Sequence, residues 1–387
     1  MLTPSEKFVA ELCEKSFLPF WSFPNPLQKK DKELCDLLVI CDNDVIIISV
    51  KDIKLSSHSD EEVRAQRWQR AAIHDSVKQI YGAERFLNLV NTVELKDKSF
   101  KVTVPPKDNR NIYRIAIAFG SENQFPLETG DFGKGFVHVF DEESTFTVLS
   151  EMDTIRDFIN YLKAKENFLS NRIILVPKEV DFLALYINTE LIFGNYADFV
   201  SVDSGLWEAY AKSVEYKKWV DTIQVSYMLD IIVSQLHRTY VAGNEGRKIR
   251  NDLEKATRLI TQETRINRRE IAIIILDAIN KKLRGRMVKP LPGTQHSYVI
   301  MPLSKKNWEG KESELQLRCL IARHDIPEAR QVIGLGIGND SEGVPVFDLA
   351  YFDIPNFTDQ MIIKVKEAKE ELGLFKNSRT TRSSQMR

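Results

Sequence analysis

Two short apolar segments separated by three polar residues constrain the fold of this chain most strongly. Leu34–Cys41 and Val45–Val50 each have the length and the aliphatic character of one strand in a sheet. Asp42-Asn43-Asp44 lies between them, and both Asp and Asn tolerate the positive φ angles of a tight hairpin turn. The sequence therefore predicts a β-hairpin whose two strands are largely buried.

This hairpin gathers three polar side chains, whichever of its two tightest turns forms. A turn at Asp42-Asn43 places Asp36 directly opposite Ser49, whereas a turn at Asn43-Asp44 places Asp36 opposite Lys51. Residues 49 and 51 share a face in the two-residue period of a strand. Asp36, Ser49 and Lys51 are therefore expected to lie within reach of one another at one end of the hairpin.

A carboxylate and an ammonium group on otherwise apolar strands each need a partner, because burying a charge alone is costly. An ion pair between Asp36 and Lys51 at the end of the sheet would satisfy both groups. The alternative is a hard-cation site, in which Asp36 binds Mg²⁺ through its carboxylate oxygens. Lys51 would then polarise an attacking water and offset the charge that develops on a phosphate.

The elements around the hairpin indicate an α/β fold with a mixed sheet. A helix is predicted to begin at Thr3-Pro4-Ser5-Glu6, a capping sequence, and to end near Pro19. A long helix is expected over Glu61–Asn91. Further strands are expected at Lys101–Val104, Tyr113–Phe119, Gly135–Phe140, Thr145–Leu149, Ser297–Pro302, Gln316–Ala322, Val332–Ile337 and Val346–Phe352, and further helices at Asp153–Leu169, Leu206–His237, Arg247–Ile260, Arg268–Leu283 and Asp359–Leu372.

A helix that bears a glutamate, a strand preceded by Glu-Leu-Cys-Asp36, and a second strand that ends Ile-Ser-Val-Lys51 together resemble the PD-(D/E)xK phosphodiesterase superfamily. Restriction endonucleases belong to this superfamily, and the resemblance covers about residues 1–90. It implies that Asp36 binds the metal, that Lys51 is catalytic, and that the backbone carbonyl of Val50 is a further metal ligand. It also implies an accessory glutamate on the first helix, for which Glu11 is the best fit and Glu6 the second choice.

The sequence departs from the family pattern at the middle acidic position, where Ser49 stands in place of Asp or Glu. A serine hydroxyl is an uncharged oxygen ligand, so the site carries one negative charge fewer. Asp52 does not replace it, because the alternation of the strand turns Asp52 to the opposite face. Glu11, or a water held by Ser49, is expected to complete the coordination of Mg²⁺ or Mn²⁺.

Two groups of basic or amide residues are candidates for binding nucleic acid. In the helix after Lys51, the resemblance implies contacts to substrate phosphate, and a solvated helix surface is the alternative. Farther on, Arg247–Lys289 holds thirteen basic and five acidic residues in a chain of net charge −1, which indicates an anionic partner or, equally, a solvated helical surface. The candidates are Arg67, Arg70, Lys78, Gln79, Arg247, Lys248 and Arg250.

Other patterns exclude several classes of protein. No apolar run approaches the length of about 18 residues that a membrane span needs, and the N-terminus lacks the pattern of a secretory signal. The four cysteines form no C-x-x-C pair and the histidines are scattered, so neither zinc nor a disulfide framework is expected. The repeated glycines of Gly334–Gly338 do not match a dinucleotide-binding loop and indicate a glycine-rich strand end. We expect reduced thiols and a cytoplasmic protein.

The chain is therefore expected to hold a restriction-endonuclease-like domain, a helical basic section, an α+β domain and a disordered tail. These sections are expected at 1–165, 166–290, 291–376 and 377–387. The expected activity is Mg²⁺-dependent endonuclease cleavage of DNA, as a deoxyribonuclease, and the resemblance suggests restriction or antiviral defence. The rival interpretation is a decayed nuclease that binds nucleic acid or docks a partner such as a helicase or an ATPase. A homo-oligomer is left open.

Overall fold

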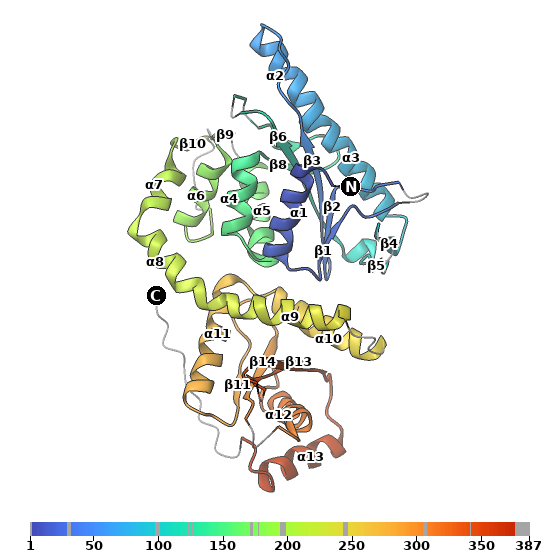
Figure 1. Cartoon of the computed structure of the whole chain (residues 1–387), viewed down its shortest axis with the longest axis vertical. Coiled ribbons are helices and arrows are strands. Elements are labelled where there is room, and N and C mark those ends of the chain that lie inside the picture. The colour runs from blue at the N-terminus through green and yellow to red at the C-terminus, as the bar shows by residue number, and fades with distance from the viewer. Residues whose placement is uncertain are drawn as a thin grey trace. The chain divides into compact units, whose positions relative to one another are not determined.

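The structure is a computed structural model that describes residues 2–28, 32–96, 101–122, 124–125, 127–170, 173–176, 178–193, 199–242, 247–304, 308–340 and 342–375. The chain divides into two compact units, Met1–Ile223 and Gln224–Arg387. Each unit has its own mixed sheet, of six strands in the first and four in the second (Figure 1). The expected tail at 377–387 lies outside the described residues, and the expected four-section division stays a prediction.

The predicted hairpin forms with the Asp42-Asn43 turn. Strand β2 (Leu37–Cys41) pairs with β3 (Asp44–Asp52) in antiparallel register, with Cys41 opposite Asp44 and Leu37 opposite Ile48. Asp42 takes a φ of 57°, the left-handed conformation that such a turn requires. This is the first of the two registers that the sequence allowed.

The hairpin lies inside a six-stranded mixed sheet with the order β1-β2-β3-β6-β8-β7. Strands β3, β6 and β8 run parallel to one another, whereas β1 and β2 on one side and β7 on the other side pair antiparallel. The α/β class that the sequence predicts is thus confirmed. The other strands of this sheet are β1 (Ser22–Pro24), β6 (Asn111–Phe119), β7 (Gly130–Asp131) and β8 (Phe136–Phe140). Two small sheets are formed by β4 (Thr92–Glu94) with β5 (Lys101–Thr103), and by β9 (Ile173–Leu175) with β10 (Phe199–Ser201).

Helices cover both faces of this sheet. Helix α1 (Pro4–Phe17) begins at the predicted capping box, in which Thr3 and Glu6 exchange hydrogen bonds. The expected helix over Glu61–Asn91 forms as α2 (Glu61–Gln69), a π-helical turn (Arg70–His74) and α3 (Asp75–Leu87). This long helix packs its apolar face on β3 and β6, and α1 lies on the other side of the sheet (Figure 1).

One predicted strand of the first unit is wrong, because Thr145–Leu149 lies in helix α4 (Glu142–Glu151). The β-branched residues of this segment favoured a strand. Asp141 instead caps the helix by accepting from the backbone N–H of Ser144 at 2.8 Å, and tertiary packing buries the helix face. The other helices of this unit are α5 (Ile155–Ser170), α6 (Glu179–Asn188), α7 (Leu206–Lys212) and α8 (Val214–Ile223).

The second unit is built on a four-stranded sheet with the order β11-β12-β13-β14, in which only the central pair, β12 and β13, is parallel. Helix α12 connects this parallel pair and packs on the sheet. The elements are a 3₁₀ turn (Gln224–Ser226), α9 (Tyr227–Ala242), α10 (Arg247–Thr261), α11 (Arg265–Asn280), β11 (Arg286–Val288), β12 (His296–Pro302), α12 (Lys311–Asp325), β13 (Gln331–Asn339), β14 (Pro345–Asp353) and α13 (Asp359–Glu370).

A second predicted strand, Gln316–Ala322, is also wrong, because these residues belong to α12. Leu315 and Cys319 pack on the sheet, while Leu320 and Ile321 pack against α13. The segment 316–322 begins with alternating polar and apolar residues and ends in the apolar run 319–322, and such a short run cannot be told from a buried strand by periodicity alone.

The glycines of β13 allow close packing on the face that α12 covers. A Cβ atom on Gly334 would lie 2.5 Å from the sulfur of Cys319, and one on Gly338 would lie 2.6 Å from the Cβ of Leu303. A larger residue at either position would therefore push α12 or the segment after β12 away from the sheet.

Within the described ranges, no helix is long and apolar enough to cross a membrane.

A buried lysine lies between α5 and α6 in the first unit. The Nζ atom of Lys165 is 2.5 Å from Oε2 of Glu179, and the hydroxyl of Tyr161 donates to Oε1 of the same carboxylate. Burial lowers the pKa of Lys165, and the adjacent Glu179 carboxylate opposes this effect. The side chain of Lys165 is only 2% exposed, so water has little access to Glu179 if the lysine is removed.

We expect Lys165→Met to lower the free energy of unfolding of this unit by about 3–5 kcal/mol, because it leaves Glu179 buried without its cation. Urea denaturation followed by tryptophan fluorescence measures the change. Lys163→Met is the matched control, since Lys163 lies on the same helix but is exposed. Equal stability of the two variants would show that the buried pair contributes nothing.

Candidate metal centre at the end of the hairpin

Asp36 lies at the start of β2, where its carboxylate is fixed by the neighbouring strand. The side chain is 4% exposed, and Oδ2 accepts a hydrogen bond from the backbone N–H of Val50 at 2.6 Å. No ion pair joins Asp36 to Lys51, although both residues are described. The Asp36–Lys51 ion pair that the sequence left open as an explanation is therefore not formed.

A second carboxyl, that of Glu33, lies beside Asp36. Burial, together with hydrogen bonding to Asp36 and repulsion from its charge, raises the pKa of Glu33 to about 7. Two carboxyl groups this close cannot both ionise freely, so near neutral pH the pair retains a proton part of the time. A bound cation would replace that proton, because it stabilises both charged carboxylates at once.

The sequence prediction missed Glu33, although it stands three residues before Asp36. In a regular strand, residues three apart point to opposite faces. Glu33 pairs with Leu27 in an isolated bridge, and the chain bends before β2 begins, so the alternation is broken between the two acids. The signal that could have found Glu33 is the acidic pair in Glu-Leu-Cys-Asp36 itself.

Asn25 is joined to Asp36 through the backbone and has an unsatisfied side-chain oxygen. Its backbone N–H donates to the carbonyl of Asp36 at 3.0 Å, which holds the two residues together. The side chain is buried, and its Oδ1 atom has no hydrogen-bond partner in the structure. A buried carbonyl-type oxygen without a donor is uncommon and costly, and it is a suitable ligand for a hard cation.

Ser49, at the position where the family pattern has an acid, is fully buried and has another partner. Its hydroxyl donates to Oε1 of Gln79 on α3 at 2.9 Å. Gln79 accepts this hydrogen bond and so joins α3 to β3, and its expected contact with nucleic acid stays a prediction. Among the described residues, Glu33 is a second acid that interacts with Asp36.

Lys51 follows Val50 on β3 and is half-buried, with no ion pair to any described residue. The charge of Lys51 acts on Asp75, which lies at the start of α3. A hydrogen bond from Lys78 lowers the pKa of Asp75, and the charges of Arg70 and Lys51 act in the same direction. Three cations thus gather around one exposed carboxylate. Arg67, on α2, is exposed and forms no ion pair with the described part of the chain.

The remaining candidates from the sequence do not join this cluster. Glu11 is 66% exposed and pairs with Lys7 at 3.7 Å, with no hydrogen bond or ion pair to Asp36. Glu6 is the closer of the two glutamates on α1, since its charge contributes to the raised pKa of Glu33. Arg247, Lys248 and Arg250 lie on α10 in the other unit, and their side chains are outside the described residues.

The donors at the end of the hairpin suit one particular kind of cation. Among the residues that the structure describes, no group of three or more His, Cys, Asp or Glu side chains could hold a metal ion. The cluster offers two carboxyls, from Glu33 and Asp36, and Asn25 is joined to Asp36 through a backbone hydrogen bond. Mg²⁺ keeps several waters and is commonly held by one or two carboxylates, so this donor set fits Mg²⁺ rather than zinc.

The chain matches no family model, no curated protein and no solved structure.

Proposed function

We propose that this protein is a Mg²⁺-dependent nuclease that hydrolyses phosphodiester bonds in DNA. The observation that supports it most strongly is the interaction between the carboxyl groups of Glu33 and Asp36. Lys51 lies on β3, the strand paired with β2, and forms no ion pair with any described residue. A structural ion pair would account for a buried aspartate and lysine, but these two groups are not paired to each other. Acids that compete for one proton are typical of catalytic groups.

Each residue has a distinct role in this proposal. Glu33 and Asp36 hold the ion, and the hydrogen bond from Val50 keeps the Asp36 carboxylate in place. Mg²⁺, when bound, lowers the pKa of a coordinated water and offsets negative charge on the phosphate. The ammonium of Lys51 donates to the phosphate or the attacking water, and Arg70 and Lys78 attract the nucleic-acid backbone through their charge.

One observation favours a second candidate function, a decayed nuclease subunit that binds nucleic acid without cleaving it. Ser49 is bonded to Gln79 and fully buried, so it supplies no ligand to a cation. The site at the end of the hairpin would then hold a cation through the carboxyls of Glu33 and Asp36 alone. A role in cytoplasmic restriction or antiviral defence, with a second copy, a helicase or an ATPase as partner, remains a proposal based on the family resemblance.

Metal affinity is expected to increase with pH because of Glu33. Its pKa of about 7 means that the carboxyl is largely protonated at pH 6, and binding then requires loss of that proton. We expect Mn²⁺ to bind about tenfold more weakly at pH 6 than at pH 8, since each pH unit below the pKa costs about one tenfold step. Isothermal titration at the two pH values measures this change.

The variants that belong to this titration are Glu33→Gln, Asp36→Asn and, as a matched control, Glu11→Gln. The first should bind Mn²⁺ weakly and without the pH dependence, and the second should lose binding. Glu11→Gln should behave as the wild type, because Glu11 is exposed and paired with Lys7. Wild-type affinity in Asp36→Asn would exclude this cluster as the metal site.

Lys51→Ala is expected to reduce Mg²⁺-dependent cleavage of plasmid DNA by about a hundredfold or more, as removal of one charge-stabilising donor commonly does. Folding and Mn²⁺ binding should persist, because the side chain has no ion-pair partner to leave behind. Lys54→Ala, an exposed lysine three residues later, is the control. Plasmid nicking gives the rate. A wild type that binds DNA but never cuts it, with Mg²⁺ or Mn²⁺, would instead support the binding subunit.

A further inference from the structure

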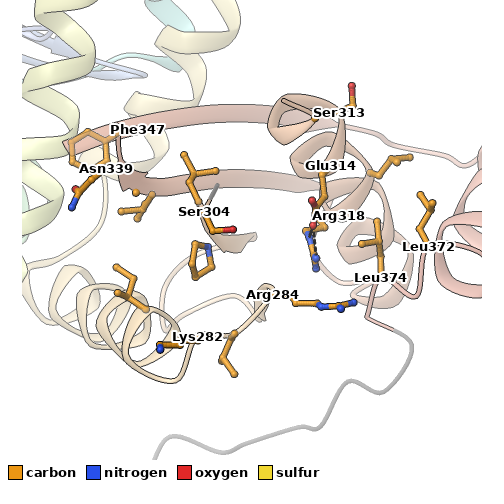
Figure 2. Close-up of a pocket in the computed structure, with 18 of the residues that line it drawn as sticks. Lys282, Arg284, Ser304, Ser313, Glu314, Arg318, Asn339, Phe347, Leu372 and Leu374 are labelled. Atoms are coloured by element: carbon orange, nitrogen blue, oxygen red, sulfur yellow. Dashed lines mark hydrogen bonds and ion pairs between the residues drawn. The ribbon is translucent and has the colours of Figure 1, made fainter. Parts of the chain in front are cut away.

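A groove of about 1180 Å³ opens in the second unit, at the carboxyl ends of the parallel strands β12 and β13 (Figure 2). Its walls come from the end of α11, the segment after β12, the first turns of α12, the start of β14 and the segment after α13. In open sheets, the carboxyl ends of parallel strands are where ligands commonly bind. None of the residues proposed above for cleavage lies in this groove.

Two cations on the α11 side of the groove have no acidic partner. Lys282 and Arg284 are exposed and form no ion pair with any described residue. The one acid among the lining residues is Glu314, and it is neutralised by Arg318. An anion in the groove would therefore meet an uncompensated positive charge.

Arg318 is the most informative of the lining residues, because its side chain is only 2% exposed. Its Nε and Nη2 atoms donate to Oε1 of Glu314 at 2.9 and 2.6 Å, while Nη1 has no hydrogen-bond partner within the described residues. The Arg284–Gly285 segment lies against this group, since a Cβ atom on Gly285 would be 2.7 Å from Nη1. Figure 2 shows Arg284 and Arg318 at the same end of the groove.

The start of α12 adds further donors to the groove. Gly310 occupies the N-cap position and supplies no capping side chain, so the first N–H groups of this helix lack a side-chain acceptor. Gly310 and Ser313 both line the groove. Free N–H groups at the positive end of a helix favour an anion, and a phosphate most of all.

Apart from Ser304 and Asn339, the rest of the lining is apolar and includes the ring of Phe347. A small inorganic anion would leave this surface in contact with water, whereas a ligand that joins an anion to a flat apolar group would cover both parts. The apolar lining residues are Ile279, Leu283, Pro302, Leu303, Leu317, Ile337, Pro345, Phe347, Leu372 and Leu374.

We propose that this groove binds a nucleoside 5′-phosphate, with its phosphate at Arg284, Arg318 and the start of α12 and its base against the apolar wall near Phe347. Two sources offer this chemistry: a free nucleotide, and the phosphorylated end of a nucleic-acid strand. The proposal does not depend on the nuclease activity, because the groove and the carboxyl pair belong to different units.

Isothermal titration of the full chain, with EDTA present to remove metal, tests this site. The ligands are adenosine 5′-monophosphate, adenosine, inorganic phosphate, and a short oligonucleotide with either a 5′-phosphate or a 5′-hydroxyl. We expect adenosine 5′-monophosphate to bind more tightly than adenosine or phosphate alone. Lys282→Ala and Arg284→Ala should each weaken it about tenfold, as expected for a lost charge-assisted hydrogen bond. Lys364→Ala, an exposed lysine on α13 outside the groove, should leave it unchanged.

The two oligonucleotides distinguish the sources. Tighter binding of the 5′-phosphorylated strand than of the free nucleotide identifies a strand end as the ligand, and the reverse identifies a free nucleotide. The proposal is overturned if no phosphate-bearing ligand saturates the wild type, or if Arg284→Ala binds as the wild type does. It is also overturned if an acidic peptide displaces the nucleotide at equal concentration, since the groove would then be a docking site for protein.

Discussion

The hydrogen bond from the N–H of Val50 to the Asp36 carboxylate links the fold of the first unit to its chemistry. It forms because the turn at Asp42-Asn43 sets the register of the hairpin, and a shift of one residue would turn Asp36 to the other face. The apolar residues of both strands stabilise the hairpin in this register, since their side chains are buried on both faces of the sheet. The packing that stabilises the unit thus also positions the candidate metal ligand.

The sequence was sufficient for the parts of the structure in which local pattern and tertiary packing agree. The turn residues and the lengths of the apolar segments predict the hairpin, and the capping box at Thr3 predicts the start of α1. The register of the hairpin then places Asp36 opposite Ser49. Prediction failed where an element is buried on several sides. The segment 145–149 is rich in β-branched residues, and 316–322 ends in a short apolar run because α12 packs both on the sheet and on α13, so neither shows a clear period of 3.6 residues.

The candidate site was predictable only in part, for a different physical reason. Asp36 and Ser49 are related by strand pairing, which a sequence reveals. Glu33 and Asn25 reach Asp36 through a bend and a loop, where no periodic rule applies. The hydrogen bond from Ser49 to Gln79 has the same origin, because only the packed structure shows that α3 turns this amide towards Ser49.

The π-helical turn at Arg70–His74 has a consequence for how this site can change in evolution or by design. Such a turn corresponds to one extra residue inserted in an α-helix, so it rotates everything that follows by about 100° relative to what precedes it. The residues of α2 and those of α3 are therefore set on the sheet by two separate helical phases. Deleting one residue from this turn would restore a regular helix, and it would carry Gln79 away from Ser49 while α2 kept its own contacts. The length of this one helix, as much as the identity of its side chains, determines which groups of α3 face the end of the hairpin.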